Sequence, residues 1–242
     1  MIVAEGLAKR FGDVQAVSDV SFGAPDGRIT ALLGPNGAGK TTTLRIISTL
    51  VAPSAGRATV DGRDIAADPL AVRARIGMLS DARGLYARLT ARENIAYYGR
   101  LRGLDDAALE ASIARLADLL EMKPLLDRRT DGFSQGERMK VAIARSLVHD
   151  PPNVILDEPG NGLDVMTTRN LREVIRQLRD AGKCVLFSSH VMQEVSALCD
   201  EIVIVAHGAV AAHGTADELL ASSGRASLED AFVHFSGGAA PQ

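Results

Sequence analysis

Apolar residues in this chain gather in short continuous runs that alternate with longer stretches of helical periodicity. Uninterrupted runs of Val, Ile and Leu are typical of strands covered on both faces, so the alternation predicts an α/β fold with a mainly parallel sheet. The expected parallel strands are 28–33, 76–79, 153–156, 183–188 and 201–205. Residues 2–7 and 14–22 alternate more loosely, as antiparallel edge strands do, and 57–65 predicts a further strand or hairpin in that layer.

Between residues 85 and 149 the pattern changes to three helical stretches. The first opens at Thr90 and the third at Ser134, each with a Glu three residues later, which is the spacing of a capping box. The second, 105–122, places apolar residues on one face: Leu109, Ile113, Leu116, Leu119 and Leu120. We therefore expect one domain over 1–235, with a helical subdomain (85–149) inserted into an α/β core (1–84 and 150–222). A short helix at 227–235 and a disordered tail at 236–242 would follow.

Composition narrows the class of protein. The 242 residues are 46% hydrophobic and carry a net charge of −3, which suits a soluble globular protein and argues against one that coats nucleic acid. No apolar run approaches the ~18–20 residues that span a bilayer, and the N-terminus lacks a secretion signal. The two cysteines, Cys184 and Cys199, fit a reducing compartment. We expect a cytoplasmic protein that serves a membrane only through a partner.

One stretch departs from this acidic balance. Residues 71–102 contain seven arginines (73, 75, 83, 88, 92, 100 and 102) against two acids, Asp81 and Glu93, a local charge of +5. Such a face suits anionic inner-leaflet lipid or acidic loops of a membrane partner, and it is equally typical of solvated helix surfaces. The sequence leaves these alternatives open.

The clearest chemical motif directly follows the predicted strand 28–33. It reads Gly34-Pro35-Asn36-Gly37-Ala38-Gly39-Lys40-Thr41 and fits the phosphate-loop pattern G-x-x-x-x-G-K-[ST]. The glycines let backbone N–H groups turn inward around an anion, Lys40 supplies charge to the β and γ phosphates, and Thr41 offers a hydroxyl to Mg²⁺. A helix expected to begin near Gly39 adds the positive end of its dipole. The motif predicts a nucleoside triphosphate site.

Two carboxylates supply the second half of this site. The predicted strand 153–156 ends in Asp157 and Glu158, and the carboxyl ends of parallel strands are where ligands bind in such folds. Asp157 suits the Mg²⁺ shell, and Glu158 can polarise an attacking water. The chain has no Asn-Lys-x-Asp motif of the kind that reads guanine in GTPases.

Three further motifs complete the order along the chain: Phe133-Ser134-Gln135-Gly136-Glu137-Arg138, Asn161-Gly162-Leu163-Asp164 and Ser188-Ser189-His190. Together with the phosphate loop, this order resembles the nucleotide-binding subunits of ABC transporters over nearly the whole chain. The resemblance implies a P-loop NTPase core of the RecA-like type, with an antiparallel β edge layer and an inserted helical subdomain. It also implies an ATPase that uses ATP and Mg²⁺ to power a separate membrane-spanning exporter.

In that family two ATPs lie between two subunits arranged head to tail. The resemblance implies that one face of each site consists of the phosphate loop with Lys40, Thr41, Thr42, Asp157, Glu158 and His190, and the other of Ser134, Gln135 and Gly136 from the partner. It assigns catalysis to Glu158, His190 and Lys40, and the metal to Thr41, Asp81 and Asp157. Asp164 would communicate across the dimer. Phe11 matches the aromatic residue that stacks on adenine, although a core position in the edge strand is the alternative for it.

The chain departs from the family pattern at three positions. In the motif 133–138, which matches the family's signature motif, Gln135 adds a side chain. Gly160 replaces the usual Thr and is expected to loosen the turn after Pro159, and Asp81 replaces a Gln that in the family contacts the metal and senses the transmembrane partner. The stretch 80–94 is similar to the sodium-exporting NatA-type group, and drug and polysaccharide exporters look alike. The remaining histidines (149, 207, 213 and 234) show no ligand spacing, and we expect them to face solvent.

The expected partners are a second copy of the ATPase subunit and a polytopic permease, with no nucleic acid, at the inner face of the cell membrane. The alternatives are a soluble ABC ATPase without a membrane partner and an ATP-sensing regulator that does not hydrolyse. The single cassette without a heptad run counts against the first alternative, and the intact Glu158 and His190 count against the second.

Overall fold

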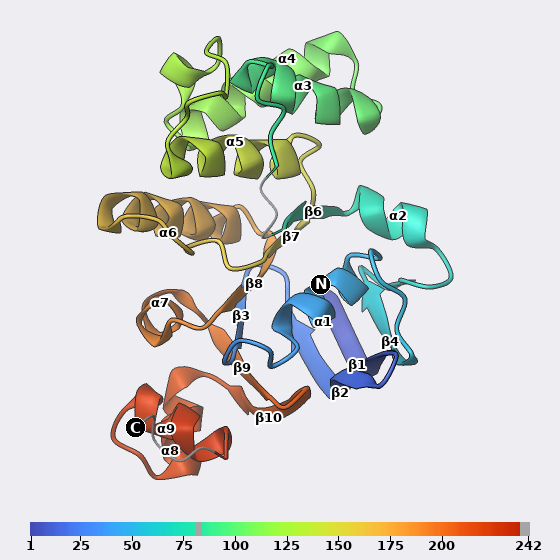
Figure 1. Ribbon diagram of the computed structural model, residues 1–242, viewed down its shortest axis with the longest axis vertical. Coiled ribbons are helices and arrows are strands. Elements are labelled where there is room, and N and C mark those ends of the chain that lie inside the picture. Colours follow the sequence, from blue (N-terminus) through green and yellow to red (C-terminus); the bar gives the residue numbers. More distant parts are fainter. Residues whose placement is uncertain (81–83, 238–242) are drawn as a thin grey trace.

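The computed structural model describes residues 1–80 and 84–237, and its strands form one sheet in the order β5-β4-β1-β2-β10-β9-β3-β8-β7-β6 (Figure 1). Strands β9, β3, β8, β7 and β6 run parallel to one another, whereas β1, β2, β4 and β5 form an antiparallel layer. The predicted α/β fold with a parallel core and an antiparallel edge is confirmed. The strands are β1 (Ile2–Phe11), β2 (Val14–Ala24), β3 (Ile29–Leu33), β4 (Ala55–Val60), β5 (Arg63–Asp64), β6 (Ile76–Leu79), β7 (Asn153–Leu156), β8 (Cys184–Ser189), β9 (Glu201–Ala206) and β10 (Ala209–Gly214).

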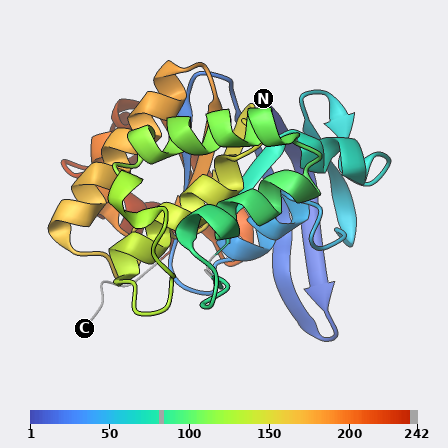
Figure 2. The same cartoon turned by 90° about the horizontal axis from the view of Figure 1, so that it is seen from above.

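The helices lie in layers on the sheet. Helices α3 and α4 lie farthest from the strands, α5 lies beneath them, and α6 lies between α5 and the sheet (Figure 1); the view from above shows α3 and α4 covering this end of the molecule (Figure 2). Both predicted capping boxes form, at Thr90 and Ser134. The α-helices are α1 (Lys40–Ile47), α2 (Pro69–Ala74), α3 (Ala91–Leu101), α4 (Asp106–Leu119), α5 (Gln135–Leu147), α6 (Val165–Asp180), α7 (Met192–Leu198), α8 (Ala216–Ser223) and α9 (Leu228–Phe235).

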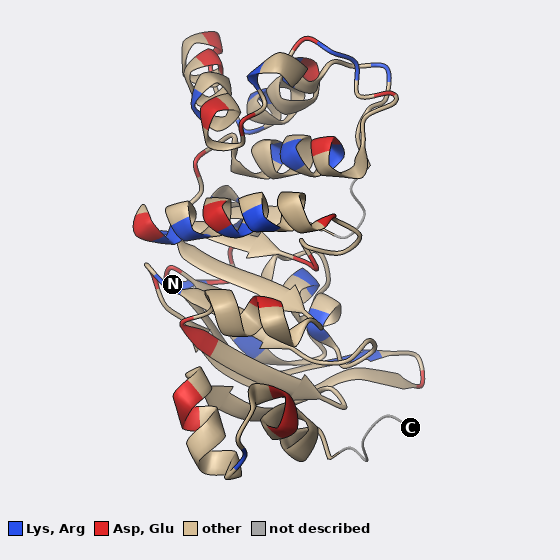
Figure 3. Ribbon diagram, turned by 90° about the vertical axis from the view of Figure 1, so that its left-hand side faces the viewer, with Lys and Arg blue, Asp and Glu red and all other residues tan. Residues whose placement is uncertain are grey.

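The parallel strands bury both faces, which is why their sequences lack polar interruptions. Along β3, Ile29 and Leu33 join the core beneath α5 and α6, while Leu32 joins the core shared with α1 and the antiparallel layer. Helix α6 contributes Leu171, Val174, Ile175 and Leu178 to the first core and carries charged residues along its outer side (Figure 3). Among the described helices, none is long and apolar enough to cross a bilayer.

The main difference from the predicted order is β10. The pattern predicted no strand after 201–205, whereas His207 and Gly208 form a two-residue hairpin turn, with φ values of +51° and +79°, that leads into β10. Positive φ at both positions is the geometry that joins two twisted antiparallel strands, and Ala206 accordingly pairs with Ala209. The turn also holds the phosphate loop, because the Gly208 N–H donates to the Ala38 carbonyl at 3.1 Å.

His149 does not face solvent as expected from the sequence. Its ring is half-buried, and Nε2 lies 3.1 Å from the Ile76 carbonyl, so Nε2 carries the proton and donates it. Burial, reinforced by the charge of Arg102, lowers the pKa of His149 to about 4. The imidazole is therefore neutral at physiological pH.

This lowered pKa predicts a specific loss of stability in acid. Between about pH 6.5 and pH 4 the unfolded chain binds a proton at His149 that the folded chain does not, so the free energy of unfolding falls as the pH falls. After allowance for partial solvent exposure, we expect His149→Gln to reduce that fall by about 2 kcal/mol. Urea unfolding at pH 7 and pH 4.5, with the exposed His207→Gln as a control, measures it. Equal pH slopes for wild type and His149→Gln would contradict the expectation.

Candidate active site

Three neighbouring strands bring the candidate residues to one edge of the sheet. Strand β8 lies between β3 and β7, with Leu33 opposite Ser189 and Leu156 opposite Phe187, so the segments after these strands meet. They border a pocket of about 610 Å³ lined by Val14, Gln15, Ala16, Asn36, Gly37, Ala38, Gly39, Lys40, Thr41, Thr42, Glu158, Asn161 and His190. The phosphate loop, Glu158 and His190 are thus gathered as predicted by their positions after strands.

The phosphate loop passes between β2 and the β9–β10 turn. Gly39 has φ +103°, and a Cβ atom there would lie 2.6 Å from the Ala16 carbonyl oxygen. A side chain at Gly34 would likewise overlap the Val205 carbonyl. Only glycine at position 39 both adopts this positive φ and leaves room for the Ala16 carbonyl. Helix α1 begins at the next residue, Lys40.

We expect Gly39→Ala to destabilise the fold by about 2–4 kcal/mol. The strain of a positive φ in alanine and the clash of its Cβ atom with the Ala16 carbonyl both contribute to this loss. Gly27→Ala is the matched control, since Gly27 also has positive φ (+65°) but nothing within 4 Å of a Cβ atom. It should cost about 1 kcal/mol. Urea unfolding of both variants measures the difference, and equal losses would show that the Ala16 contact costs nothing.

Lys40 lies at the centre of the loop. Its side chain is only 5% exposed, and Nζ donates to the carbonyls of Gly34 (2.7 Å) and Pro35 (3.2 Å). The same ammonium lies 3.3 Å from Glu158 Oε1. The loop backbone therefore fixes a buried positive charge beside a carboxylate.

Asp157 is the best candidate for a metal ligand. It is fully buried, and Oδ1 accepts hydrogen bonds from Thr41 Oγ1 (3.0 Å) and Ser188 Oγ (2.7 Å). Oδ2 is also buried and has no hydrogen-bond partner within the described residues. A buried carboxylate oxygen without a partner is costly, and a hard cation would satisfy it.

Thr41 and Asp157 therefore fit Mg²⁺, which usually binds through one or two protein oxygens, waters and substrate phosphates. Within the described ranges no group of three His, Cys, Asp or Glu side chains could hold a metal ion. The third predicted metal ligand, Asp81, lies outside the described residues.

Glu158 and His190 form a pair at the mouth of the pocket. His190 Nδ1 lies 2.9 Å from Glu158 Oε2, and the Glu158 side chain is 15% exposed. The Glu158 N–H donates to Ser188 Oγ at 2.9 Å, and the residue has φ +46°. Positive φ is costly for a glutamate, so the surrounding contacts hold this backbone against strain, as is common at functional sites.

Ser134, Gln135, Gly136 and Asp164 lie outside the phosphate-loop pocket. Ser134 and Asp164 are the N-caps of α5 and α6, and neither they nor Gln135 and Gly136 line the phosphate-loop pocket. The Ser134 side chain accepts the Glu137 N–H, whereas Asp164 accepts from Met166 and Thr167. The Thr167 hydroxyl, with these backbone bonds, lowers the pKa of Asp164.

Phe11 lies beside the pocket rather than in the core. It ends β1, is 48% exposed, and pairs with Val14, which lines the pocket. Lys9 Nζ lies 5.0 Å from the centre of the ring. This position leaves a ring face near the rim, as stacking on a base requires.

Two of the departures from the family pattern, Gly160 and Gln135, lie against residues distant in the chain. A side chain at Gly160 would overlap the Glu194 carboxylate, which also accepts a hydrogen bond from Ser189 Oγ at 3.1 Å. Gln135 Nε2 donates to the Asn161 carbonyl at 3.2 Å and occupies the space beside Gly162. Sequence reasoning missed Ser188 and Glu194, although the Ser188-Ser189-His190 motif could have drawn attention to Ser188.

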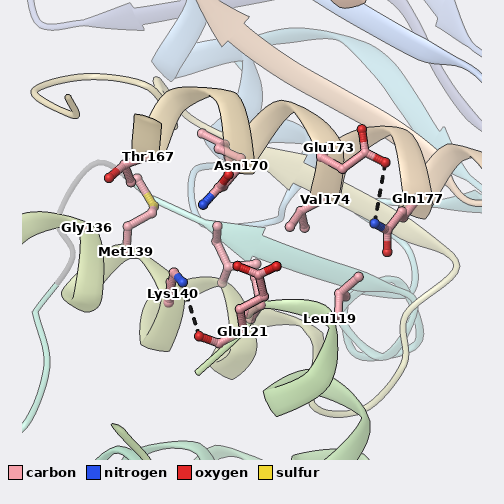
Figure 4. Close-up of a pocket in the computed structure, with 13 residues that line it drawn as sticks. Leu119, Glu121, Gly136, Met139, Lys140, Thr167, Asn170, Glu173, Val174 and Gln177 are labelled. Carbon is pink, nitrogen blue, oxygen red and sulfur yellow. Dashed lines mark hydrogen bonds between the residues drawn. The ribbon is translucent and has the colours of Figure 1, made fainter. Parts of the chain in front are cut away.

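A second pocket, between α6 and the end of α4 with α5, is not a nucleotide site. It holds only about 90 Å³, and Lys140 at its edge donates to the Glu121 carbonyl (Figure 4). Met139 and Val174 supply part of its apolar wall. Such a space admits a few waters and no triphosphate.

Proteins of similar sequence are ATP-binding subunits, in agreement with the nucleotide site described above. The sequence profile of the ABC transporter family matches residues 17–161. The chain is 44% identical, over 96% of its length and 97% of that protein, to the ABC transporter ATP-binding protein NatA of Bacillus subtilis. It is 38% identical to the lipopolysaccharide export system ATP-binding protein LptB of Escherichia coli, over 90% of this chain and 92% of that protein.

Solved structures show the same relationship. The ATP-binding subunit of an ABC transporter superposes with a TM-score of 0.89 at 29% identity, covering 98% of this chain and 99% of that one. Dimeric ATP-binding cassettes share the fold at 24% identity and a TM-score of 0.80. The phosphate loop, the carboxylate pair and these relatives together show that the chain belongs to the ABC transporter family, as an ATP-binding ATPase subunit.

Proposed function

We propose that this chain binds ATP with Mg²⁺ in the phosphate-loop pocket, hydrolyses ATP as a dimer of two subunits, and powers export through a separate membrane protein. The observation that carries this proposal is that three groups of side chains meet at one edge of the sheet. They are the buried Lys40 ammonium, the Thr41–Asp157 pair and the Glu158–His190 pair.

The phosphate loop and Lys40 hold the β and γ phosphates, and Phe11 stacks on the adenine. Thr41 and Asp157 hold Mg²⁺, which when bound neutralises charge on the phosphate oxygens. Thr42, next along α1, lines the same pocket. A triphosphate beside Lys40 competes with Glu158 for the ammonium, so we expect ATP to weaken the 3.3 Å ion pair between them.

Glu158 is the proposed general base. Released from Lys40, its carboxylate would accept a proton from the attacking water as the water oxygen forms a bond to the γ phosphorus. The bond from that phosphorus to the bridging oxygen breaks, so ADP and inorganic phosphate are the products. His190 Nδ1 lies 2.9 Å from Oε2 of that carboxylate, and in this proposal the imidazole would contact the γ phosphate. The strained backbone at Glu158 keeps the carboxylate directed at the pocket.

The proposed dimer is supported by the position of Ser134, Gln135 and Gly136 in the fold. Ser134, Gln135 and Gly136 form the N-terminus of α5, a favourable place for an anion, yet they lie outside their own subunit's pocket. In a head-to-tail dimer each subunit would offer this helix end to the γ phosphate held by the other. Asp164 would then face the partner at the interface.

The membrane partner is a polytopic permease, and the chain would work in the cytoplasm at the inner face of the membrane. Its similarity to the lipopolysaccharide export system ATP-binding protein LptB favours an exporter. The resemblance of residues 80–94 to the NatA-type group further suggests sodium ions or a drug-like molecule as the transported substrate.

Affinity purification from detergent-solubilised membranes tests the partner. We expect a polytopic membrane protein to co-purify with wild type and to stimulate Mg²⁺-dependent ATP hydrolysis. Lys40→Ala should retain the partner and lose the hydrolysis, which separates assembly from catalysis. An active ATPase with which no membrane protein co-purifies would instead indicate a soluble ABC ATPase, and ATP binding without any hydrolysis would indicate a regulator.

A further inference from the structure

Glu194 is a half-buried carboxylate that lies outside the phosphate-loop pocket, and the roles proposed above give it no function. It belongs to the first turn of α7, the short helix that follows His190. Its Oε2 atom accepts a hydrogen bond from Ser189 Oγ at 3.1 Å. Within residues 1–80 and 84–237 the carboxylate forms no ion pair with a Lys, Arg or His side chain. A role as half of a stabilising ion pair therefore does not account for its place in this part of the chain.

The Ser189 hydroxyl joins the residues on both sides of His190. Ser189 is 1% exposed, and its hydroxyl donates to Glu194 while it accepts the Val191 N–H at 3.0 Å. A serine hydroxyl carries a single proton, so the bond to the carboxylate fixes where that proton points and leaves the lone pairs for the Val191 N–H. Glu194 thereby helps to hold the turn that carries His190, whose Nδ1 lies 2.9 Å from Glu158 Oε2.

The same carboxylate also lies against the segment that carries Glu158. Gly160 follows Glu158 by two residues, in a turn where the Leu163 N–H donates to the Gly160 carbonyl at 3.2 Å. A Cβ atom at Gly160 would lie 2.4 Å from Glu194 Oε1. The backbone at Gly160 does not have a positive φ, so an added side chain would conflict with the carboxylate and not with the backbone conformation. Glu194 thus lies between the segments that follow β7 and β8.

We propose that Glu194 is a positioning residue for ATP hydrolysis, which holds the segments after β7 and β8 together so that His190 meets Glu158. The inference rests on the proposed roles of these two residues and adds a third that contacts neither ATP nor metal. Its hydrogen bond orients Ser189, and its bulk supports the turn at Gly160. A displacement of about 1 Å can slow an enzyme by up to about a hundredfold, so such support affects the rate.

Three replacements of Glu194 test this role in the full chain. Glu194→Ala removes the acceptor and should lower kcat about tenfold, whereas KM for ATP should stay within about twofold because the phosphate loop and Phe11 are unchanged. Glu194→Gln keeps the length of the side chain and an oxygen that accepts the Ser189 proton, so it should restore most of the rate. Glu194→Asp keeps the charge but is one methylene shorter, so it should remain slow.

This order of activities separates positioning from a role in folding alone. A carboxylate in the first turn of α7 also interacts favourably with the helix dipole. A role of that kind depends on charge and would favour Glu194→Asp over Glu194→Gln, which is the reverse of the expected order. Gln193→Ala, at the neighbouring exposed position of α7, is the matched control and should keep the wild-type kcat and unfolding midpoint.

Gly160→Ala tests the second contact without removing the carboxylate. The new Cβ atom meets the far end of a flexible side chain, so Glu194 should move aside at little cost in stability and lose its hydrogen bond to Ser189. We expect kcat to fall by about the same factor as in Glu194→Ala. In the Glu194→Ala background the space is already free, so Gly160→Ala should cause no further loss and the two effects should not add. Urea unfolding of the single and double variants verifies that each is folded.

The outcomes separate this inference from the proposed function. If wild type hydrolyses no ATP, or if His190→Ala is as fast as wild type, the proposed roles fail and the inference with them. If His190→Ala is slow but Glu194→Ala keeps the wild-type kcat, the inference alone is overturned. Additive losses for Glu194→Ala and Gly160→Ala, or a Glu194→Gln variant as slow as Glu194→Ala, would also overturn it.

Discussion

Replacement of Glu158 by Gln is expected to leave ATP binding intact and to slow hydrolysis by about two to four orders of magnitude. The amide keeps the size of the side chain and its contact with His190 but cannot accept a proton from water. It also removes the negative charge 3.3 Å from Lys40, so ATP should bind at least as tightly. The variant should therefore accumulate as an ATP-bound dimer, visible by size-exclusion chromatography with ATP.

Glu218→Gln is the matched control for this prediction. Glu218 completes the capping box of α8, a role that Gln also fills, and it lies in no contact with the pocket. Its hydrolysis rate should equal that of wild type. A Glu158→Gln variant that hydrolyses ATP at the wild-type rate would show that another group accepts the proton.

The sequence predicted the parts of the site that depend on local order. A phosphate loop follows a strand and opens a helix, and a carboxylate pair at the end of another parallel strand lies at the same edge of the sheet. The Thr41–Asp157 hydrogen bond is the structural result. The same reasoning predicted the capping boxes at Thr90 and Ser134, because both partners lie within one helical turn.

The features that sequence reasoning missed depend on residues far apart in the chain. The basic stretch 71–102 gave a charge count but not the partners of Arg75 and Arg92, which come from Asp61, Glu110 and Asp127. Similarly, Gly160 suggested a loosened turn, whereas the structure places the Glu194 carboxylate in the space of the missing side chain. These contacts form only when the folded chain brings distant residues together, so the spacing of residues along the chain does not reveal them.

The turn at His207-Gly208 shows a different limit of prediction from sequence. A polar residue and a glycine inside an apolar run are consistent with both an interruption and a tight hairpin. The deciding factor is positive φ at both positions, which glycine adopts readily and histidine less readily. The hydrogen bond of this turn to Ala38 gives β10 a part in holding the phosphate loop, which no local motif indicates.

Mixing two inactive variants is expected to restore activity if the sites are shared between subunits. Lys40→Ala removes the phosphate-binding ammonium, and Ser134→Ala alters the helix end that would serve the partner's ATP. A heterodimer of the two contains one site with Lys40 from one subunit and Ser134 from the other. Equal amounts, mixing at random, should recover about a quarter of wild-type ATPase activity if the two sites work independently.

Loss of a helix cap must be separated from loss of a phosphate contact in this experiment. Ser134→Ala should destabilise α5 by about 1 kcal/mol, and Thr215→Ala removes an equivalent capping box from α8, far from the pocket. Thr215→Ala should show the same small stability loss with full activity. If the mixture recovers nothing, crosslinking of cysteines introduced at Asn36 and Gln135 distinguishes obligate coupling from a wrong arrangement. Burial raises the pKa of the native Cys184 thiol to about 12, so it contributes little background, and absence of an Asn36–Gln135 crosslink with ATP would refute the head-to-tail dimer.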